Sequence, residues 1–144
     1  MIILLYLCSM IREDIYQRML KLGLTQKKIC DDLGLCPQNF NAFIRGTRPI
    51  PYKDLITTLE YLRLGVGFAE YQYTSVAPHA IHLAVRDRMY ALNLRAKDLA
   101  ALTGVNLSSI SSFISGKRNI SIKNLETIMS RIRLAVKPIN NKAK

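Results

Sequence analysis

The chain has 144 residues, 49% of them hydrophobic, and carries a formal net charge of +11 at pH 7. The hydrophobic fraction excludes an intrinsically disordered basic tail protein, and the length is too short for a (β/α)8 barrel of about 250 residues. The length allows one ordinary domain or two very small ones, and the positive charge predicts an anionic partner such as nucleic acid or an acidic membrane surface.

The chain begins with an apolar segment, residues 1–8, that no basic residue precedes. It is far shorter than the roughly 20 apolar residues of a membrane span and lacks the charged start of a secretory signal. Two interpretations are open. Residues 1–10 are an apolar extension packed on the body as a strand or helix, or residues 1–9 lie upstream of a true initiator at Met10. Neither interpretation makes the segment a membrane anchor.

Residues 11–64 align with residues 81–134 without a gap when the sequence is shifted by 70 positions, and 17 of the 54 aligned residues are identical. We call these segments the first repeat and the second repeat. The matches are mostly apolar residues and glycines, as expected for a duplicated packing plan, so we predict two copies of one small domain. The predicted organisation is an apolar extension (1–10), a first domain (11–64), a connector with a strand (65–80), a second domain (81–134), and a strand with a mobile basic tail (135–144).

The first predicted helix of each repeat has one apolar face at helical spacing. The face comprises Ile11, Ile15, Met19 and Leu22 in the first repeat and Ile81, Val85, Met89 and Leu92 in the second. A second helix follows Thr25, a good N-cap residue, and is expected to bury Ile29, Cys30 and Leu33. Gly34 and Gly104 then interrupt the pattern where a left-handed turn requires glycine.

A third helix begins near Cys36-Pro37 or Asn106-Leu107, because proline suits the first helical position and asparagine is a good cap. It ends at Gly46 or Gly116. The residues expected to point inward are Phe40, Phe43, Ile110 and Phe113 from the third helices, and Leu55, Leu59, Leu62, Leu125, Ile128, Met129 and Ile132 from the fourth. Residues 65–73 and 134–138 favour short strands that are candidates to pair, and residues 74–78 are the predicted linker.

Two short helices joined by a glycine-centred turn and followed by a basic loop are the parts of a helix-turn-helix DNA-binding unit. Both repeats resemble the Cro/lambda-repressor-like helix-turn-helix family, over most of the chain. The first repeat does so in Leu24-Thr25-Gln26, Ile29-Cys30, Gly34-Leu35, Phe40, Phe43, Gly46-x-Arg48-x-Ile50 and Leu55, and the second in Leu99-Ala100, Gly104-Val105, Ile110-Ser111, Phe113 and Gly116-Lys117-Arg118-Asn119-Ile120-Ser121. The implied fold class is mainly α, with two tandem bundles of four to five short helices, each followed by a candidate strand.

The resemblance implies that the third helix lies in the DNA major groove and that the second helix crosses the phosphate backbone. By position, the base-facing residues are then Pro37, Gln38, Asn39 and Asn41 in the first repeat and Leu107, Ser108, Ser109, Ser111 and Ser112 in the second. The phosphate-contacting residues are Gln26, Lys27, Arg45, Arg48, Lys97, Lys117, Arg118 and Asn119, together with backbone amides at the helix starts. Glutamine and asparagine can form two hydrogen bonds with adenine, whereas serine discriminates less between bases.

The sequence departs from the family pattern at two places. Arg95-Ala96 stands where the first repeat has Thr25-Gln26, so the second repeat is expected to lose both the helix cap and the phosphate-contacting amide, with Arg95 a candidate replacement for the amide. Ile44 and Ile114 occupy a position that is usually polar in the family. They indicate either a contact between copies or chains, or extra packing on the fourth helix.

The remaining polar residues give no support for catalysis or for a cofactor. His79 and His82 lack an evident third ligand for a metal, and no phosphate-binding glycine loop, catalytic triad or paired carboxylates occur at a recognisable spacing. The three cysteines are an odd number without a CxxC pair, which favours a reducing cytoplasm over a disulfide framework or a zinc site. We therefore predict a cytoplasmic protein that is not an enzyme, with Cys30 in a packing role.

Positive charge is concentrated in the second half of the chain. Residues 71–144 hold 12 basic and 3 acidic residues, net +9, whereas residues 1–70 hold 9 and 7, net +2. Since phosphate neutralisation supplies most non-specific affinity, the second repeat is expected to anchor the protein on DNA. The first repeat then either refines sequence choice or has become an interaction domain.

The leading hypothesis is a sequence-specific, repressor-like transcriptional regulator that binds double-stranded DNA, as a homodimer or as an intramolecular pseudo-dimer. Half-sites about 10–10.5 bp apart are expected, in an imperfect palindrome because the third helices differ. The alternative is an antitoxin-like interaction module in which one copy binds a protein partner. Membrane binding is not expected, because no amphipathic helix with a long basic face is present.

Overall fold

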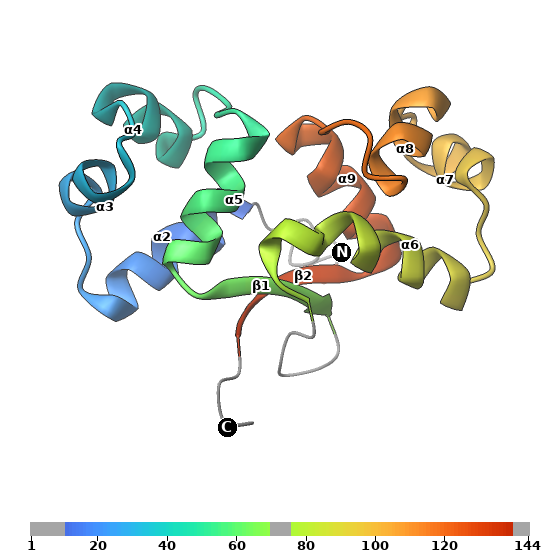
Figure 1. The fold of residues 1–144 in the computed structure, drawn as a ribbon, viewed down its shortest axis with the longest axis horizontal. Coiled ribbons are helices and arrows are strands. Elements are labelled where there is room, and N and C mark those ends of the chain that lie inside the picture. The colour runs from blue at the N-terminus through green and yellow to red at the C-terminus, as the bar shows by residue number, and fades with distance from the viewer. Residues whose placement is uncertain (1–10, 70–75, 140–144) are drawn as a thin grey trace, which may run out of the picture.

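A computed structural model describes residues 11–69 and 76–139, and the predictions for residues 1–10, 70–75 and 140–144 fall outside this described part. Within it, the chain forms eight α-helices, one short 3-10 helix and a two-stranded sheet (Figure 1). The predicted fold class, mainly helical with short strands, is confirmed. None of the helices in the described ranges has the length and apolar character needed to span a membrane.

The elements occur in the same order in both repeats. Those from the first repeat are α2 (Ile11–Leu22), α3 (Gln26–Leu33), α4 (Pro37–Arg45), α5 (Tyr52–Tyr61) and β1 (Leu64–Phe68). After the 3-10 helix η1 (Pro78–Ala80) come α6 (Ile81–Ala91), α7 (Ala96–Thr103), α8 (Leu107–Ile114), α9 (Ile122–Ile132) and β2 (Leu134–Pro138). Four helices and a strand thus follow one another twice, with boundaries close to those expected from the sequence.

The helix boundaries follow from local capping chemistry. Thr25 Oγ1 accepts a hydrogen bond from the Lys28 N–H at 3.1 Å, and Asn106 Oδ1 accepts one from the Ser108 N–H at 2.8 Å. These side chains satisfy backbone donors that have no partner within the first turn of a helix. Pro37 occupies the first turn of α4, where a missing N–H costs nothing. The predicted starts of the second and third helices are therefore confirmed.

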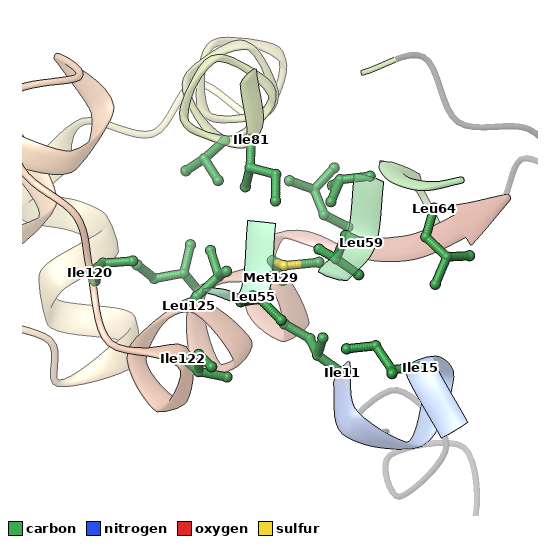
Figure 2. Close-up of a cluster of buried hydrophobic side chains, with 14 of the residues drawn as sticks. Ile11, Ile15, Leu55, Leu59, Leu64, Ile81, Ile120, Ile122, Leu125 and Met129 are labelled. Atoms are coloured by element: carbon green, nitrogen blue, oxygen red, sulfur yellow. The ribbon is translucent and has the colours of Figure 1, made fainter. Parts of the chain in front are cut away.

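A single hydrophobic cluster runs through both repeats (Figure 2). The residues predicted to point inward from the third and fourth helices are all buried. Figure 2 shows side chains of α2, α5, α6 and α9 gathered in this cluster, including Ile15, Leu55, Ile81 and Leu125. Burial of this apolar surface is the main source of stability that the fold offers.

The prediction that Leu22 and Leu92 complete the apolar face of the first helices is wrong. Their exposed fractions are 45% and 43%. The chain turns through a left-handed residue directly after each one, at Gly23 or Asn93. This turn brings Leu24 and Leu94 against the core in their place.

The two strands pair antiparallel, as their sequences suggested. The register places Leu64 opposite Pro138, Val66 opposite Val136, and Phe68 opposite Leu134. On the other side of β1, the Val76 carbonyl accepts a hydrogen bond from the Val66 N–H at 3.0 Å. Val76 also packs against the core, and Pro78 is buried. The described end of the predicted linker, residues 76–78, is therefore part of the packed structure.

The sheet joins the two repeats at one end of the molecule (Figure 1). Helices α5 and α9 lie in the middle, and α3 and α7 lie on the outer sides. Helices α4 and α8 lie at the end opposite the sheet, one on either side of the middle pair. This arrangement presents both third helices toward the same side of the molecule.

Candidate nucleic-acid interface

The turns between the second and third helices have the same geometry in both repeats. Gly34 and Gly104 are left-handed, with φ of 70° and 76°. The N–H of each glycine donates to the carbonyl four residues earlier, in Cys30 or Ala100. Burial raises the pKa of the Cys30 thiol, which keeps this side chain in its unreactive neutral form. The predicted packing role of Cys30 fits this environment.

The predicted base-facing residues lie on the third helices, α4 and α8, and most of their side chains are exposed. In α4 these are Pro37, Gln38, Asn39 and Asn41, all exposed. In α8, Leu107, Ser108, Ser109 and Ser111 are exposed, whereas Ser112 is half-buried. The first repeat thus presents amide groups, and the second presents hydroxyls around an exposed leucine.

The basic loop after each third helix is held by two backbone hydrogen bonds to one carbonyl. In the second repeat, the N–H groups of Lys117 and Arg118 both donate to the Ser112 carbonyl, at 2.9 and 3.2 Å. In the first repeat, Thr47 and Arg48 donate in the same way to Ala42, at 2.9 and 3.3 Å. The loops therefore hold Arg48 and Arg118 at equivalent places, with both side chains exposed.

Five of the predicted contact residues of the second repeat line one surface hollow. They are Ser108, Ser109, Ser112, Arg118 and Asn119. The same hollow includes Ser121 and Asn124 at the start of α9, which the sequence reasoning missed. Ser121 caps α9 by accepting from the Asn124 N–H at 3.2 Å, so its capping position was the available signal. Lys97, Ser111 and Lys117 are exposed but do not line this hollow.

The predicted contact residues of the first repeat are distributed between two hollows. Asn39 and Arg48 line one of them, beside Lys53 and Asp54 at the start of α5. The other hollow contains Gln26, Asn41 and Arg45, with Arg12 of α2 at its edge. Gln38 and Lys27 are exposed and line neither hollow. Lys53 and Arg12 are the cations that sequence reasoning missed here.

Ile44 and Ile114 are partly buried and pack against the core, in line with the packing interpretation. In the first repeat, Arg12 Nη1 donates to the Ile44 carbonyl at 3.3 Å. The guanidinium of Arg12 also covers Gly46, where an added Cβ would come within 2.7 Å of it. The Arg12 side chain of α2 therefore covers the C-terminal end of α4 and bonds to one of its last carbonyls.

Helix α3 carries two ion pairs that offset its positive charge. Lys27 Nζ lies 2.8 Å from Asp31, and Lys28 Nζ lies 3.3 Å from Asp32. The hydrogen bond to Asp31 raises the pKa of Lys27. Hydrogen bonds from the Tyr61 hydroxyl and from Lys28 lower the pKa of Asp32, so this carboxylate is charged at neutral pH. The lysines of α3 therefore do not contribute an unopposed positive surface.

Helix α7 lacks these acidic partners, because Ala101 and Leu102 stand at the equivalent positions. The expected loss of the side-chain cap at the start of α7 is confirmed, because Arg95 supplies none. Asp98 stabilises this helix start instead, since its Oδ2 accepts a hydrogen bond from the Arg95 N–H at 2.9 Å. That bond is the main cause of the lowered pKa of Asp98. The Arg95 side chain lies 3.4 Å from the same carboxylate, so the candidate phosphate ligand contacts Asp98 in this structure.

The two histidines have separate surroundings. His82 packs edge-on against Phe113, with ring centroids 6.3 Å apart. His79 Nδ1 lies 3.6 Å from Glu60 at the exposed side of η1. The two imidazoles therefore contact different residues, Phe113 for His82 and Glu60 for His79.

In a comparison with protein families, residues 85–135 match a family described as helix-turn-helix. The match begins within α6 and ends within β2, so it includes α7, the turn at Gly104 and α8. Neither the comparison with curated proteins nor that with solved structures gave a match. The second repeat is thus similar to a family of DNA-binding domains, which is not a family of enzymes.

Proposed function

We propose that the protein is a sequence-specific transcriptional regulator of the repressor type that binds double-stranded DNA. In this proposal residues 11–64 and 81–134 are two helix-turn-helix domains, with α4 and α8 as recognition helices. The observation that carries the proposal is the hollow at the start of α8, where Ser108, Ser109, Ser112, Arg118 and Asn119 gather. Hydroxyls and an amide suit base edges and phosphate oxygens, and Arg118 suits phosphate.

The equivalent geometry of the first repeat supports the second part of the proposal. Its α3–α4 turn and basic loop use the same glycine conformation and the same backbone hydrogen bonds as the matched region. Gln38, Asn39 and Asn41 are exposed on α4, where they are available for adenine recognition. The backbone amides at the start of each recognition helix add donors for phosphate.

Fluorescence anisotropy with a library of genomic duplex fragments tests the proposal. We expect binding at low salt and a linear fall of log affinity with log salt concentration. The double variant K117A/R118A should weaken binding to all sequences and reduce the salt slope by about 2 if both cations neutralise phosphates. In contrast, Gln38→Ala and Asn39→Ala should relax sequence preference while leaving the salt slope unchanged.

The matched control is K21A/R86A, which removes the same charge from exposed positions of α2 and α6. If the reduction in affinity is local to the recognition surface, K21A/R86A has a much smaller effect than K117A/R118A. Absence of duplex binding at low salt would overturn the proposal. Co-purification of a stoichiometric protein partner that resists nuclease and high salt would then favour the interaction-module alternative.

A further inference from the structure

The register of β1 and β2 is symmetric: exchanging each residue for its counterpart 70 positions away leaves the pairing unchanged. Val66 lies opposite Val136, which is its own counterpart 70 residues later. On either side of this pair, Leu64 faces the counterpart of Phe68, and Phe68 faces the counterpart of Leu64. Such a self-complementary pairing defines an isologous interface, the kind formed by two identical subunits about a two-fold axis. Here both partners belong to one chain.

Two backbone hydrogen bonds beyond the strands are related by the same shift of 70 residues. The Ala69 N–H donates to the Arg133 carbonyl at 2.8 Å, and the Ile139 N–H donates to the Arg63 carbonyl at 2.9 Å. Each donor and each acceptor is shifted by 70 residues between the two bonds. Arg63 and Arg133 are also both left-handed, with φ of 57° and 62°. The two-fold relation therefore includes the chain leaving each fourth helix.

Side chains extend this contact between the repeats toward the recognition helices. The ring of Tyr52, the first residue of α5, packs edge-on against Phe113 of α8 with centroids 5.9 Å apart. Burial raises the pKa of Tyr52 to about 12, so its hydroxyl stays neutral. We call the whole contact between the repeats, from β1 and β2 to Tyr52 and Phe113, the seam. One hydrophobic cluster includes residues of both α4 and α8, so the two helices belong to one packed body that contains the seam.

The two halves joined at the seam present different chemistry on the same side of the molecule. Helix α4 presents Gln38, Asn39 and Asn41, whereas α8 presents serines. The charge is also unequal, at +2 for residues 1–70 and +9 for residues 71–144. A symmetric homodimer presents two identical surfaces to its two half-sites and has no preferred direction on DNA. In this chain the two repeats are related by a pseudo-two-fold axis, but the surfaces presented by α4 and α8 differ.

We propose that a single chain occupies a whole operator of two inverted, unlike half-sites, and that it binds in one orientation. The proposal rests on the proposed function and adds the class of DNA site and the stoichiometry. The pseudo-two-fold axis requires inverted half-sites, and the unlike recognition helices require that the half-sites differ. The α8 half-site supplies most of the electrostatic attraction, and the α4 half-site supplies most of the amide-mediated base recognition.

Cys36 gives a direct test of orientation, because it is exposed at the start of α4 whereas Cys30 is buried. In a Cys8→Ser background, an iron–EDTA cleavage group attached to Cys36 marks the half-site that α4 contacts. The operator is first selected from a random duplex library. We expect cleavage to favour one half-site over the other by about tenfold or more, the discrimination that a single amide–adenine pair supports.

The matched control moves the label to the other recognition helix. Asn106 is the counterpart of Cys36 and is also exposed, so C8S/C36S/N106C carries the cleavage group at the start of α8. This variant should cleave the opposite half-site of the same operator. Native mass spectrometry of the complex should give one chain per duplex.

The outcomes separate the two proposals. If no duplex is bound, the proposed function fails. If the duplex is bound but both half-sites are cleaved equally, or two chains are required per operator, the proposed function stands and the single-chain oriented complex is overturned. Cleavage of one half-site by Cys36 and of the other by N106C supports it.

Discussion

Glu126 on α9 accepts a 2.6 Å hydrogen bond from the backbone N–H of Ile11, the first residue of α2 in the other repeat. Asp14, one turn further along α2, lines the same pocket at the seam as Ile11 and Glu126. Burial, followed by the charges of Glu13 and Glu126, raises the pKa of Asp14 from 3.8 to about 6. The counterparts of Asp14 and Glu126 are Ala84 and Ile56, so the acidic pair is present at one of the two symmetry-related positions of the seam and not at the other.

The raised pKa of Asp14 makes stability depend on pH in a defined direction. The folded state binds the Asp14 proton more tightly than the unfolded state, so the stability gained from it is complete below about pH 3.8 and is lost as the pH rises through about 6. Asp14→Asn should therefore stabilise the protein at neutral pH, by about 1–2 kcal/mol after allowance for solvent screening. Urea denaturation from about pH 4 to pH 7 measures this gain.

The control for this prediction is Asp87→Asn, which removes an exposed carboxylate from α6. It should leave the shape of the stability–pH curve unchanged. A gain in stability for Asp14→Asn that is equally large at the acidic and neutral ends of the range would contradict the assignment, because the penalty of an ionised Asp14 is absent when the group is protonated.

A second pair of contacts predicts unequal roles for two arginines at equivalent positions. Arg18 Nε donates to the Leu62 carbonyl at 2.9 Å, and Arg88 Nε donates to the Ile132 carbonyl at 2.7 Å. Each bond satisfies a carbonyl at the C-terminal end of the fourth helix. The Arg88 guanidinium additionally lies 4.5 Å from the centroid of the Phe68 ring.

We expect Arg18→Ala to destabilise the fold by about 1–2 kcal/mol, through the lost charged hydrogen bond. Arg88→Ala should cost about 0.5–1 kcal/mol more, because the cation–π contact is lost as well. Thermal unfolding of the two variants compares them under identical conditions. Phe68→Leu, which removes the ring and keeps an apolar side chain, should reduce the difference between them. An equal loss for both arginines would contradict the role given to Phe68.

The cap at the start of α7 gives a prediction with the opposite pH direction. Since the Arg95 N–H lowers the pKa of Asp98, the stability contributed by this carboxylate is present above its ordinary pKa of 3.8 and is lost as the pH falls through the lowered value. Asp98→Ala should therefore lower the melting temperature at neutral pH and have little effect in strong acid. Asp98→Asn should restore part of the loss, because its amide oxygen still accepts the Arg95 N–H. Equal losses at both ends of the pH range would show that the charge is not involved.

Local chemistry made much of this fold predictable from the sequence. Thr25, Pro37 and Asn106 act on the adjacent turn, so the helix starts they mark depend little on the rest of the chain. Hydrophobic periodicity gave the wrong core residue at Leu22 and Leu92. The chain turns at a left-handed residue directly after each of them, so that the leucine two positions later packs against the core instead. A pattern of apolar residues does not show at which residue a helix ends.

The seam was only partly predictable, because it depends on pairing between segments far apart in the chain. The repeat and the β-favouring residues suggested that the strands pair, but the register centred on Val66 and Val136 was not evident. The acidic pair of Asp14 and Glu126 has no motif, since its members are on different repeats. On the candidate DNA surface, the sequence was enough to predict exposed positions on the third helices for most base-facing residues. It did not show that Lys27 is paired with Asp31.

The ion pairs of α3 lead to a reciprocal prediction for DNA affinity. If α3 and α7 approach the phosphate backbone, Asp31 and Asp32 oppose binding in the first repeat, whereas Ala101 and Leu102 do not in the second. The double variant D31N/D32N should therefore raise affinity by about 3- to 10-fold between about 50 and 200 mM salt, and A101D/L102D should lower it by a similar or larger factor. Both changes are at exposed positions, so the core is left intact.

The A101N/L102N variant controls for the poor helix propensity of aspartate, since asparagine has a similar propensity and no charge. Anisotropy titrations at several salt concentrations measure each effect. If A101N/L102N weakens binding as much as A101D/L102D, the electrostatic explanation is wrong. If D31N/D32N changes nothing while A101D/L102D weakens binding, the second repeat alone contacts phosphate through its second helix.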